Sequence, residues 1–318
     1  MNIACTGSIA FDYLMTFPGY FKDHILPENL EAISLSFLVD SMVRQRGGTA
    51  PNICYSLAML GEQPQLVGTV GEDFSEYREW LETNGVDTKF AKKIDGVFTA
   101  SFFANTDLSN AQIASFYTGA MRFASKVRIH DMRPNLPDLV VISPNDPSAM
   151  DMYVNECIEL DIPYLYDPGQ QVVRSAPEEL RKGSINAQSL FLNDYEYRLL
   201  KKHTGITEDE LLETLDFMVI TGGESGATIY VKDQRYLIPV VPTNDIKDPT
   251  GVGDAFRAGF LRGYSLGLDW QTIGQMGALA ATYCLENQGT QVHFYTIDEY
   301  IKRYRKFFND NGVLDVLK

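Results

Sequence analysis

The 318-residue chain has few of the residues that build disulfide frameworks and transition-metal sites. It contains only four cysteines and four histidines. The cysteines lie far apart without a C-x-x-C pair, and no H-E-x-x-H motif occurs. A disulfide scaffold and a His/Cys metal centre are therefore disfavoured. Thiols that stay reduced are typical of the cytoplasm, which is the compartment we expect.

Long apolar runs and positive charge are also scarce. No stretch approaches the roughly 18–20 apolar residues of a membrane helix, and the first residues do not have the pattern of a signal peptide. Lys and Arg number 27 against 42 Asp and Glu, which gives a net charge of −15. Because such a surface repels nucleic-acid backbones and anionic lipids, we expect neither a nucleic acid nor a membrane as a partner. Small anions are not excluded, since a few backbone N–H groups can bind them.

The chain does have the alternation of short apolar runs and helical stretches that is typical of α/β proteins. The predicted strands are residues 2–6, 65–70, 138–143, 163–167, 189–193 and 217–221. The predicted helices are residues 51–60, 74–84, 146–160, 194–203, 207–215, 253–266, 270–286 and 297–308. Most of these strands are apolar throughout, as strands buried on both faces are. The pattern predicts a doubly wound, mainly parallel sheet flanked by helices.

Two segments, 13–46 and 95–118, break this rhythm. They contain alternating stretches, such as residues 32–39 and 98–104, which indicate a half-exposed antiparallel sheet. Such a small sheet, inserted into a large α/β unit, is expected to form a lid or an oligomer face.

The motif D-P-T-G-V-G-D-A-F-R-A-G-F spans residues 248–260. Gly251 and Gly253 permit a tight turn and a close approach that side chains would block. They precede a predicted helix, whose free N–H groups form an anion site. Asp254 in the first turn is either a helix-start residue stabilised by the dipole or a general base beside bound phosphate.

This motif is similar to the C-terminal signature of the PfkB (ribokinase-like) family of small-molecule kinases. Four more segments resemble elements of that family, in the family's order along the chain: Gly7-Ser8 with Asp12, G-G-T-A-P-N at 47–52, N-D-Y-E at 193–196 and T-G-G-E-S-G at 221–226. The resemblance implies one ribokinase-like α/β domain over residues 1–318, with the lid inserted as segments 13–46 and 95–118. It also implies a kinase that uses ATP and Mg²⁺.

Within the family, several segments resemble the actinobacterial adenosine kinases: residues 6–10, 35–40, 112–117, 193–196 and 248–261. This implies phosphorylation of adenosine to AMP at its 5′-hydroxyl. Asp254 would be the general base. The N–H groups of Gly251, Val252 and Gly253 would hold the transferring phosphoryl group.

The resemblance also assigns the nucleotide site. Thr221, Gly223 and Gly226 would line the ATP site together with Asn193 and the Gly251–Gly253 turn. Glu196, with Asn193, would organise Mg²⁺ through its waters. Some family members bind a monovalent cation at positions matching Asp248 and Thr250, so a K⁺ requirement is left open.

On the acceptor side, the resemblance implies that Asp12, Gly48 and Asn52 hold the ribose hydroxyls. Phe102 and Phe116 would sandwich the base, unless they only pack the small sheet. Three further positions match the substrate site: Ser8, Ser36 and Gln170. Ser36 would sit on a lid strand that reaches the site of a second subunit, which implies a homodimer through the lid.

Several alternatives stay open at this point. A ribokinase- or fructokinase-type sugar kinase, or a kinase for another purine nucleoside, fits the same motifs. A Rossmann-type dehydrogenase is disfavoured, because residues 7–12 lack the three glycines of G-x-G-x-x-G. A catalytically inactive relative is disfavoured because Asp254 and its glycines are intact. Arg257, three residues after Asp254, would either tune that carboxylate or pair with a structural acid.

Overall fold

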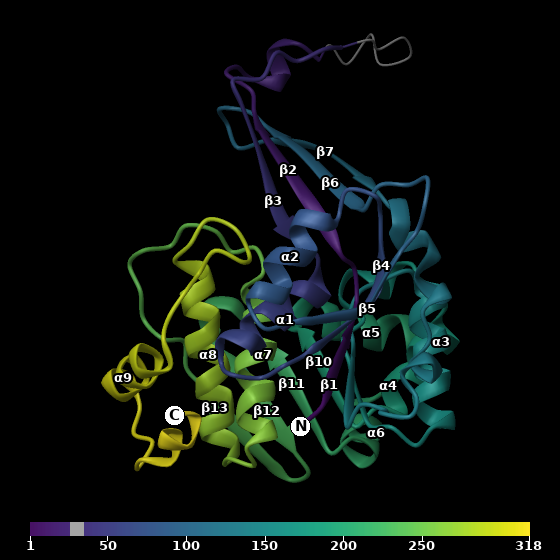
Figure 1. Ribbon diagram of the computed structural model, residues 1–318. Helices are drawn as coiled ribbons and strands as arrows, with labels where there is room; N and C mark the ends of the chain where they lie inside the picture. Colours follow the sequence, from purple (N-terminus) through teal and green to yellow (C-terminus); the bar gives the residue numbers. More distant parts are fainter. Residues whose placement is uncertain (26–34) are drawn as a thin grey trace.

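A nine-stranded sheet forms the centre of the computed structural model, which describes residues 1–25 and 35–318 (Figure 1). Its strands are ordered β13-β12-β11-β10-β9-β8-β1-β4-β5. The bounds are β1 Ile3–Thr6, β4 Gln65–Val70, β5 Asp87–Lys93, β8 Leu139–Ile142, β9 Tyr164–Tyr166, β10 Ser189–Asn193, β11 Phe217–Thr221, β12 Ala227–Val231 and β13 Gln234–Ile238. The strands from β11 to β5 pair in parallel, and the β12–β13 hairpin is antiparallel. The predicted doubly wound, mainly parallel sheet is confirmed.

Helices cover both faces of this sheet. Their bounds are α1 Thr49–Met59, α2 Ser75–Thr83, α3 Pro147–Glu159, α4 Pro177–Ile185, α5 Asp194–Thr204, α6 Glu208–Thr214, α7 Val252–Ser265, α8 Trp270–Leu285 and α9 Ile297–Phe307. One apolar core lies under α1, α2, α7, α8 and α9, and the other lies under α3, α4, α5 and α6. Successive strand residues point to opposite cores: Cys5 packs into the first and Ala4 into the second. Burial on both faces explains why these strands are apolar throughout.

A second, four-stranded sheet projects from the carboxyl edge of the large sheet (Figure 1). Its order is β3-β2-β6-β7, with bounds β2 Ala10–Thr16, β3 Ser41–Gly47, β6 Ala100–Thr106 and β7 Gln112–Tyr117. Strands β2 and β6 pair in parallel, so the small sheet is mixed, whereas the alternation predicted an antiparallel one. Both strands leave the large body in the same direction, which makes their pairing parallel.

The stretch 32–39 was wrongly predicted to contain a strand. Residues 32–34 lie outside the described part of the chain, and residues 35–39 are irregular. Phe37 packs its ring edge-on against Phe17 and Phe21, each 5.0 Å away between ring centres. This aromatic cluster, and not a strand ladder, orders the segment, and the strand begins only at Ser41.

The sequence patterns missed β5, the β12–β13 hairpin and α4. Edge strands are half-exposed and carry polar residues, so their apolar signal is weak. None of the helices in residues 1–25 and 35–318 is long and apolar enough to span a membrane.

Candidate active site

The loops that follow β1, β8, β9 and β10 meet at one edge of the large sheet, below the small sheet. Strand β1 has β4 on one side and β8 on the other, so the chain order reverses there. In open α/β sheets, such a reversal leaves a crevice at the carboxyl ends of the strands where ligands bind. The predicted site residues Ser8, Asn193 and Thr221 all follow or end strands at this edge.

Asp254 lies buried in the first turn of α7 at this edge. Its Oδ2 accepts a hydrogen bond of 2.9 Å from Asn52 Nδ2, and Arg257 Nη1 lies 3.9 Å from its Oδ1. Burial raises the pKa of Asp254 to about 6, although Arg257 and Asn52 act in the opposite direction. A carboxylate with a pKa near the working pH suits a general base.

Arg257 joins Asp254 to a second buried acid, Asp167, which follows β9. The Arg257 Nε lies 2.7 Å from Asp167 Oδ2. Burial raises the pKa of Asp167 to about 7, and Arg257 opposes that rise. Arg257 therefore combines both predicted roles, since it pairs with a structural acid and lies beside Asp254. Sequence reasoning missed Asp167 as a site residue, although an acid directly after a buried strand was a usable signal.

Asn52 is held in place from behind by Gln291. The Gln291 Nε2 donates to Asn52 Oδ1 at 2.8 Å and also to the Tyr77 hydroxyl. That hydroxyl donates in turn to Gly47 O at 3.0 Å. Sequence reasoning missed Gln291 because no local pattern links it to Asn52, 239 residues away.

The turn before α7 has the geometry expected of an anion site. Gly251 has a φ of +75°, and a Cβ there would lie 2.7 Å from Thr290 Cγ2. Asp248 braces the turn, since its carboxylate accepts from Thr250 N and Gly289 N at 2.9 and 3.0 Å. In residues 1–25 and 35–318, no acceptor is bonded to the N–H of Gly253. The Val252 N–H makes one long bond of 3.4 Å to Pro249 O.

Asp12 lies over Gly47 at the base of the small sheet. A Cβ on Gly47 would come within 2.4 Å of Asp12 Oδ2, so the carboxylate occupies the space that a side chain would need. Burial, with a further contribution from the charge of Asp248, raises the pKa of Asp12 to about 6. That electrostatic effect places Asp12 near the braced turn before α7.

Gly48 and Ser8 shape the start of α1. Gly48 has a φ of +95°, and a Cβ there would lie 2.4 Å from Ser8 O, so only glycine fits. The Ser8 Oγ accepts from Thr49 N at 3.2 Å. This cap comes from a loop that is distant in the sequence. It explains why α1 begins at Thr49, two residues before the predicted start at residue 51.

Phe102 and Phe116 face each other across β6 and β7, and Phe102 is also paired with Asp12 on β2. Residues directly opposite one another in a sheet project from the same face. The three predicted substrate residues therefore form one row on one face of the small sheet, which we call the Asp12 row. The Phe116 side chain is 43% exposed.

Asn193 and Thr221 lie side by side at the ends of β10 and β11. Asn193 caps α5: its Oδ1 accepts from Glu196 N, and Glu196 Oε2 accepts from Asn193 N, both at 2.8 Å. In the following loop, Gly223 has a φ of +59° with open space around a Cβ, whereas a Cβ on Gly226 would lie 2.1 Å from Ile238 O.

The chain matches the pfkB family carbohydrate kinase family over residues 10–296. It belongs to the PfkB family. A nucleoside kinase of Methanocaldococcus jannaschii is 29% identical over 313 residues, covering 96% of this chain and 97% of that protein. A crystal structure of the nucleoside kinase from that organism matches with a TM-score of 0.86 over 96% of this chain and 98% of the other, at 28% identity.

A structure of Burkholderia thailandensis nucleoside kinase in complex with inosine matches with a TM-score of 0.85 and 34% identity, covering 96% of this chain and 98% of that chain. The adenosine kinase of Sinorhizobium meliloti matches with a TM-score of 0.73 and 19% identity, over 96% of this chain and 98% of the other, which shows the fold alone. The ribokinase-like fold is thereby confirmed.

The Mg²⁺ expected in a PfkB kinase fits the oxygen chemistry of this edge. Glu196 is half-buried, and its charge raises the pKa values of both Asp167 and Asp254, so it lies near the cluster. In the described part of the chain, no group of three or more His, Cys, Asp or Glu side chains is arranged to hold a metal ion. Mg²⁺ keeps several waters and binds substrate phosphates, so one carboxylate acting through water suffices.

Two further predicted residues, Ser36 and Gln170, have exposed side chains. Ser36 is exposed in the irregular segment beyond the Thr16 end of β2, and not on a strand as predicted. Gln170 is exposed, whereas its neighbour Gln171 is buried, and its Oε1 has no hydrogen-bond partner among residues 1–25 and 35–318.

Proposed function

We propose that this PfkB chain is an ATP-dependent nucleoside kinase that phosphorylates the 5′-hydroxyl, with adenosine as the preferred acceptor and AMP as the product. The observation that carries the proposal is the Asp12 row. It combines a carboxylate, which can accept hydrogen bonds from two vicinal hydroxyls, with two neighbouring aromatic side chains on the same face, which can stack on a flat base.

In this proposal, the nucleoside lies between the Asp12 row and the loop edge of the large sheet. Asp12 and Asn52 hold the ribose hydroxyls, and Asp254 takes the proton from the 5′-hydroxyl as it attacks. The N–H groups of the Gly251–Gly253 turn stabilise the charge that develops on the transferring phosphoryl group. Bound Mg²⁺ would neutralise charge on the phosphates of ATP, and Glu196 would orient its waters. Thr221, Gly223, Gly226 and Asn193 would line the ATP site.

The proposal treats residues 1–318 as one kinase domain with segments 13–46 and 95–118 as its lid. The projecting small sheet carries the Asp12 row, so a movement of this sheet toward the large body would cover the nucleoside. Closure would exclude water before phosphoryl transfer. Ser36 would then contribute from a second subunit.

The identities of the relatives support a nucleoside over a free sugar. The kinases of M. jannaschii and Methanothermobacter thermautotrophicus are both nucleoside kinases, and each covers 95% or more of this chain. The B. thailandensis kinase was solved with inosine. Ribose or fructose has no base to place between Phe102 and Phe116.

A substrate panel tests the proposal. The purified protein is assayed with ATP–Mg²⁺ and, separately, adenosine, inosine, guanosine, cytidine, ribose and fructose. We expect the highest kcat/KM for adenosine. A preference for inosine would correct the base and keep the nucleoside class, and a preference for a sugar would overturn the proposal. An Asp254→Asn preparation, made in parallel, controls for contaminating kinases.

A monovalent cation is tested in the same assay. Replacing K⁺ by tetramethylammonium shows whether Asp248 and Thr250 serve such a cation.

A further inference from the structure

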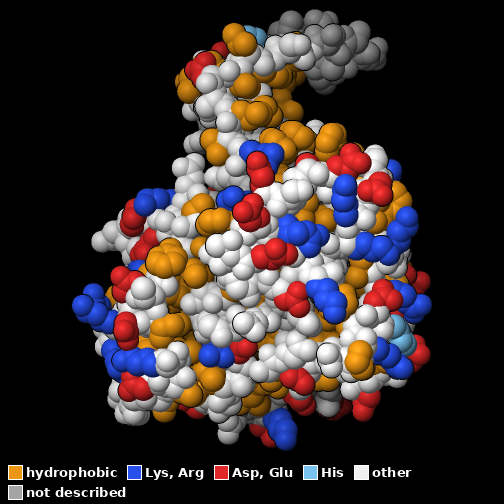
Figure 2. Space-filling view, in the orientation of Figure 1, with side chains coloured by type: hydrophobic (Ala, Val, Ile, Leu, Met, Phe, Trp, Pro, Cys, Tyr) orange, Lys and Arg blue, Asp and Glu red, His pale blue; other side chains and the backbone are white. Residues whose placement is uncertain are grey.

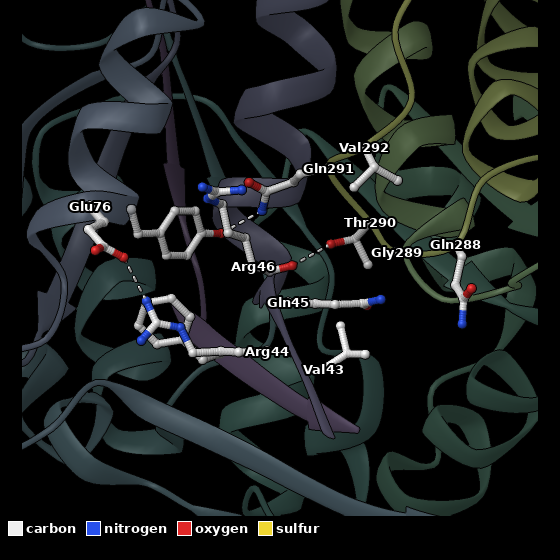
Figure 3. A pocket seen from close by; sticks show the side chains of 12 residues that line it. Val43, Arg44, Gln45, Arg46, Glu76, Gln288, Gly289, Thr290, Gln291 and Val292 are labelled. Atoms are coloured by element: carbon white, nitrogen blue, oxygen red, sulfur yellow. Dashed lines mark hydrogen bonds and ion pairs between the residues drawn. The ribbon is translucent and has the colours of Figure 1, made fainter. Parts of the chain in front are cut away.

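A pocket of about 550 Å³ lies at the free edge of β3, adjacent to the site described above (Figure 3). Its walls are residues 43–46 of β3, Glu76 and Tyr77 of α2, Phe11, and the loop 288–292. Arg44 and Arg46 are two residues apart on one strand, so they share a face, and this face is opposite to the Asp12 row. Val43 and Gln45 lie on the face of the Asp12 row, so the pocket reaches around the edge of β3, but its two arginines lie on the other face.

The two arginines make this pocket unusually positive for a chain with a net charge of −15. The Arg46 guanidinium lies 4.4 Å from the centre of the Trp80 ring, and within the described residues no carboxylate lies within ion-pair distance of it. Arg44 lies 4.4 Å from the Phe11 ring centre and 3.2 Å from Glu76, whose side chain is 84% exposed. Such an exposed ion pair contributes at most about 1 kcal/mol, so a bound anion can replace Glu76.

We propose that this pocket binds a phosphate group, either free or as the ester of a small molecule, between Arg44 and Arg46. Alternate residues of a strand are roughly 7 Å apart, which lets two guanidinium groups flank one anion. Each planar guanidinium donates two parallel hydrogen bonds. One such fork engages both oxygens of a carboxylate, whereas a phosphate has further oxygens that can face the second arginine. The pocket volume falls in the range of small-molecule sites, roughly 300–1,000 Å³, which leaves room for an organic part beside Gln45 and Gln288.

Gln291 connects the pocket to the catalytic edge. Gln291 lines the pocket, and its Nε2 donates to Asn52 Oδ1 at 2.8 Å. Asn52 in turn donates to Asp254. A phosphate oxygen in the pocket competes with Asn52 for the Gln291 amide, which loosens the support of Asp254. Given the proposed function, the bound phosphate lowers kcat.

Trp80 provides a direct probe of binding, because its ring lies under Arg46 and the chain has only two tryptophans. In a Trp270→Phe background, Trp80 fluorescence is titrated with inorganic phosphate and, separately, with glycerol 3-phosphate at constant ionic strength. We expect a saturable change in fluorescence. The ligand concentration at its midpoint should rise at least tenfold in the Arg46→Gln variant. The matched control is Arg122→Gln: Arg122 also lies over an aromatic ring, 4.7 Å from the Phe123 ring centre.

A response to both probes assigns a free phosphate site, and a response to the ester alone assigns an organic phosphate; either supports the proposal. A response that persists in Arg46→Gln, or no saturable response, overturns it. If thermal unfolding shows Arg46→Gln to be misfolded, Arg44→Gln replaces it.

The coupling to Asp254 is tested by measuring kcat at saturating ATP with and without phosphate. We expect phosphate to lower the kcat of the wild type and to leave the kcat of Arg46→Gln unchanged, each compared with the same protein without phosphate. Binding without an effect on kcat overturns the coupling alone. The fluorescence experiment needs no turnover, so its outcome is independent of the proposed function.

Discussion

The properties of Asp254 come from the side chains that surround it. Burial makes its ionised form costly, while Arg257 and Asn52 make that form less costly, and the balance leaves a pKa of about 6. Arg257 is itself held by the buried Asp167. The carboxylate is thus ionised at neutral pH and remains basic enough to accept a proton, as its proposed role of general base requires.

Replacing Asp254 by Asn removes the base and keeps the shape of the side chain. We expect kcat to fall by about a hundred- to ten-thousand-fold, the usual contribution of a general base. In the wild type, the rate is lost as the pH falls through about 6, because Asp254 becomes protonated there. ATP binding, measured by calorimetry, should survive the substitution. A wild-type rate in Asp254→Asn would remove the residue as the base.

Arg257→Gln tests whether Arg257 positions and tunes Asp254. Because Arg257 lowers the pKa of Asp254, its removal should move the acidic limb of the kcat profile above pH 6. Breaking the buried pair with Asp167 should also destabilise the fold by about 3–5 kcal/mol. Arg257→Lys keeps the charge and should restore the limb.

The matched control for Arg257→Gln is Arg262→Gln. Arg262 lies on the same helix, α7, and forms a comparably buried ion pair with Glu62. We expect this control to lower the melting temperature and to leave the pH limb in place. If the limb stays near pH 6 in both variants, Arg257 has only a structural role.

At the scale of elements, the start of α7 and the face alternation of the small sheet place the chemistry. Gly251 takes the left-handed conformation that ends the preceding loop and begins the helix. In the small sheet, residues 102 and 103 of β6 face opposite sides. Each of these two features can be tested by a substitution at the site and the same substitution at a matched position elsewhere in the chain.

Gly251→Ala is compared with Gly267→Ala, since both glycines have left-handed backbone, with φ of +75° and +67°. Each alanine should cost about 1–2 kcal/mol in the free energy of unfolding, measured in urea. At Gly251 the Cβ would also lie 2.7 Å from Thr290 Cγ2, whereas at Gly267 it would have no neighbour within 4 Å among the described residues. We therefore expect only Gly251→Ala to lose activity. Equal activities would show that the turn tolerates displacement.

Phe102→Ala is compared with Phe103→Ala on the opposite face, where Phe103 stacks on Tyr13 with ring centres 4.7 Å apart. If Phe102 stacks on the base, its loss removes about 1–3 kcal/mol of binding. The KM for the nucleoside should then rise about fivefold or more, with little change for ATP. Phe103→Ala should leave both KM values near wild type. The same KM in both variants would mean that Phe102 only packs the sheet.

At the scale of the whole molecule, the small sheet projects with apolar side chains on its surface (Figure 2). On the face opposite the Asp12 row, Met42 is 62% exposed and Ile113 is 42% exposed. Exposed apolar patches on a sheet mark interaction surfaces. This surface supports the proposed homodimer through the lid.

Ile113→Lys tests that dimer. We expect the wild type to sediment with twice the monomer mass and the variant to shift toward the monomer mass, because a buried lysine opposes association. Ile158→Lys on α3, where the side chain is similarly exposed at 46%, is the control and should not change the mass. A monomeric wild type would contradict the lid dimer and leave Ser36 without a site.

Much of the fold was predictable because its signals are local. The apolar runs match β4, β10 and β11 residue for residue, since strands buried on both faces must be apolar throughout. The missed strands β5 and β13 lie at the two edges of the sheet and carry exposed polar residues, which weakens their apolar pattern. The stretch 32–39 was predicted to be extended because of its alternation, but in its described part, residues 35–39, Phe37 packs into an aromatic cluster instead.

The sequence by itself determined the local parts of the site: the glycines of the turn before α7, the aspartate in its first turn, and the capping pair Asn193 and Glu196. Each depends on backbone geometry within a few residues, which residue type dictates directly. Only the tertiary structure decided what surrounds them. Asn52 reaches Asp254 across 202 residues, and Asp167 reaches Arg257 from another strand. Those contacts depend on the order of the strands and the packing of helices against them, and no short-range pattern encodes that order.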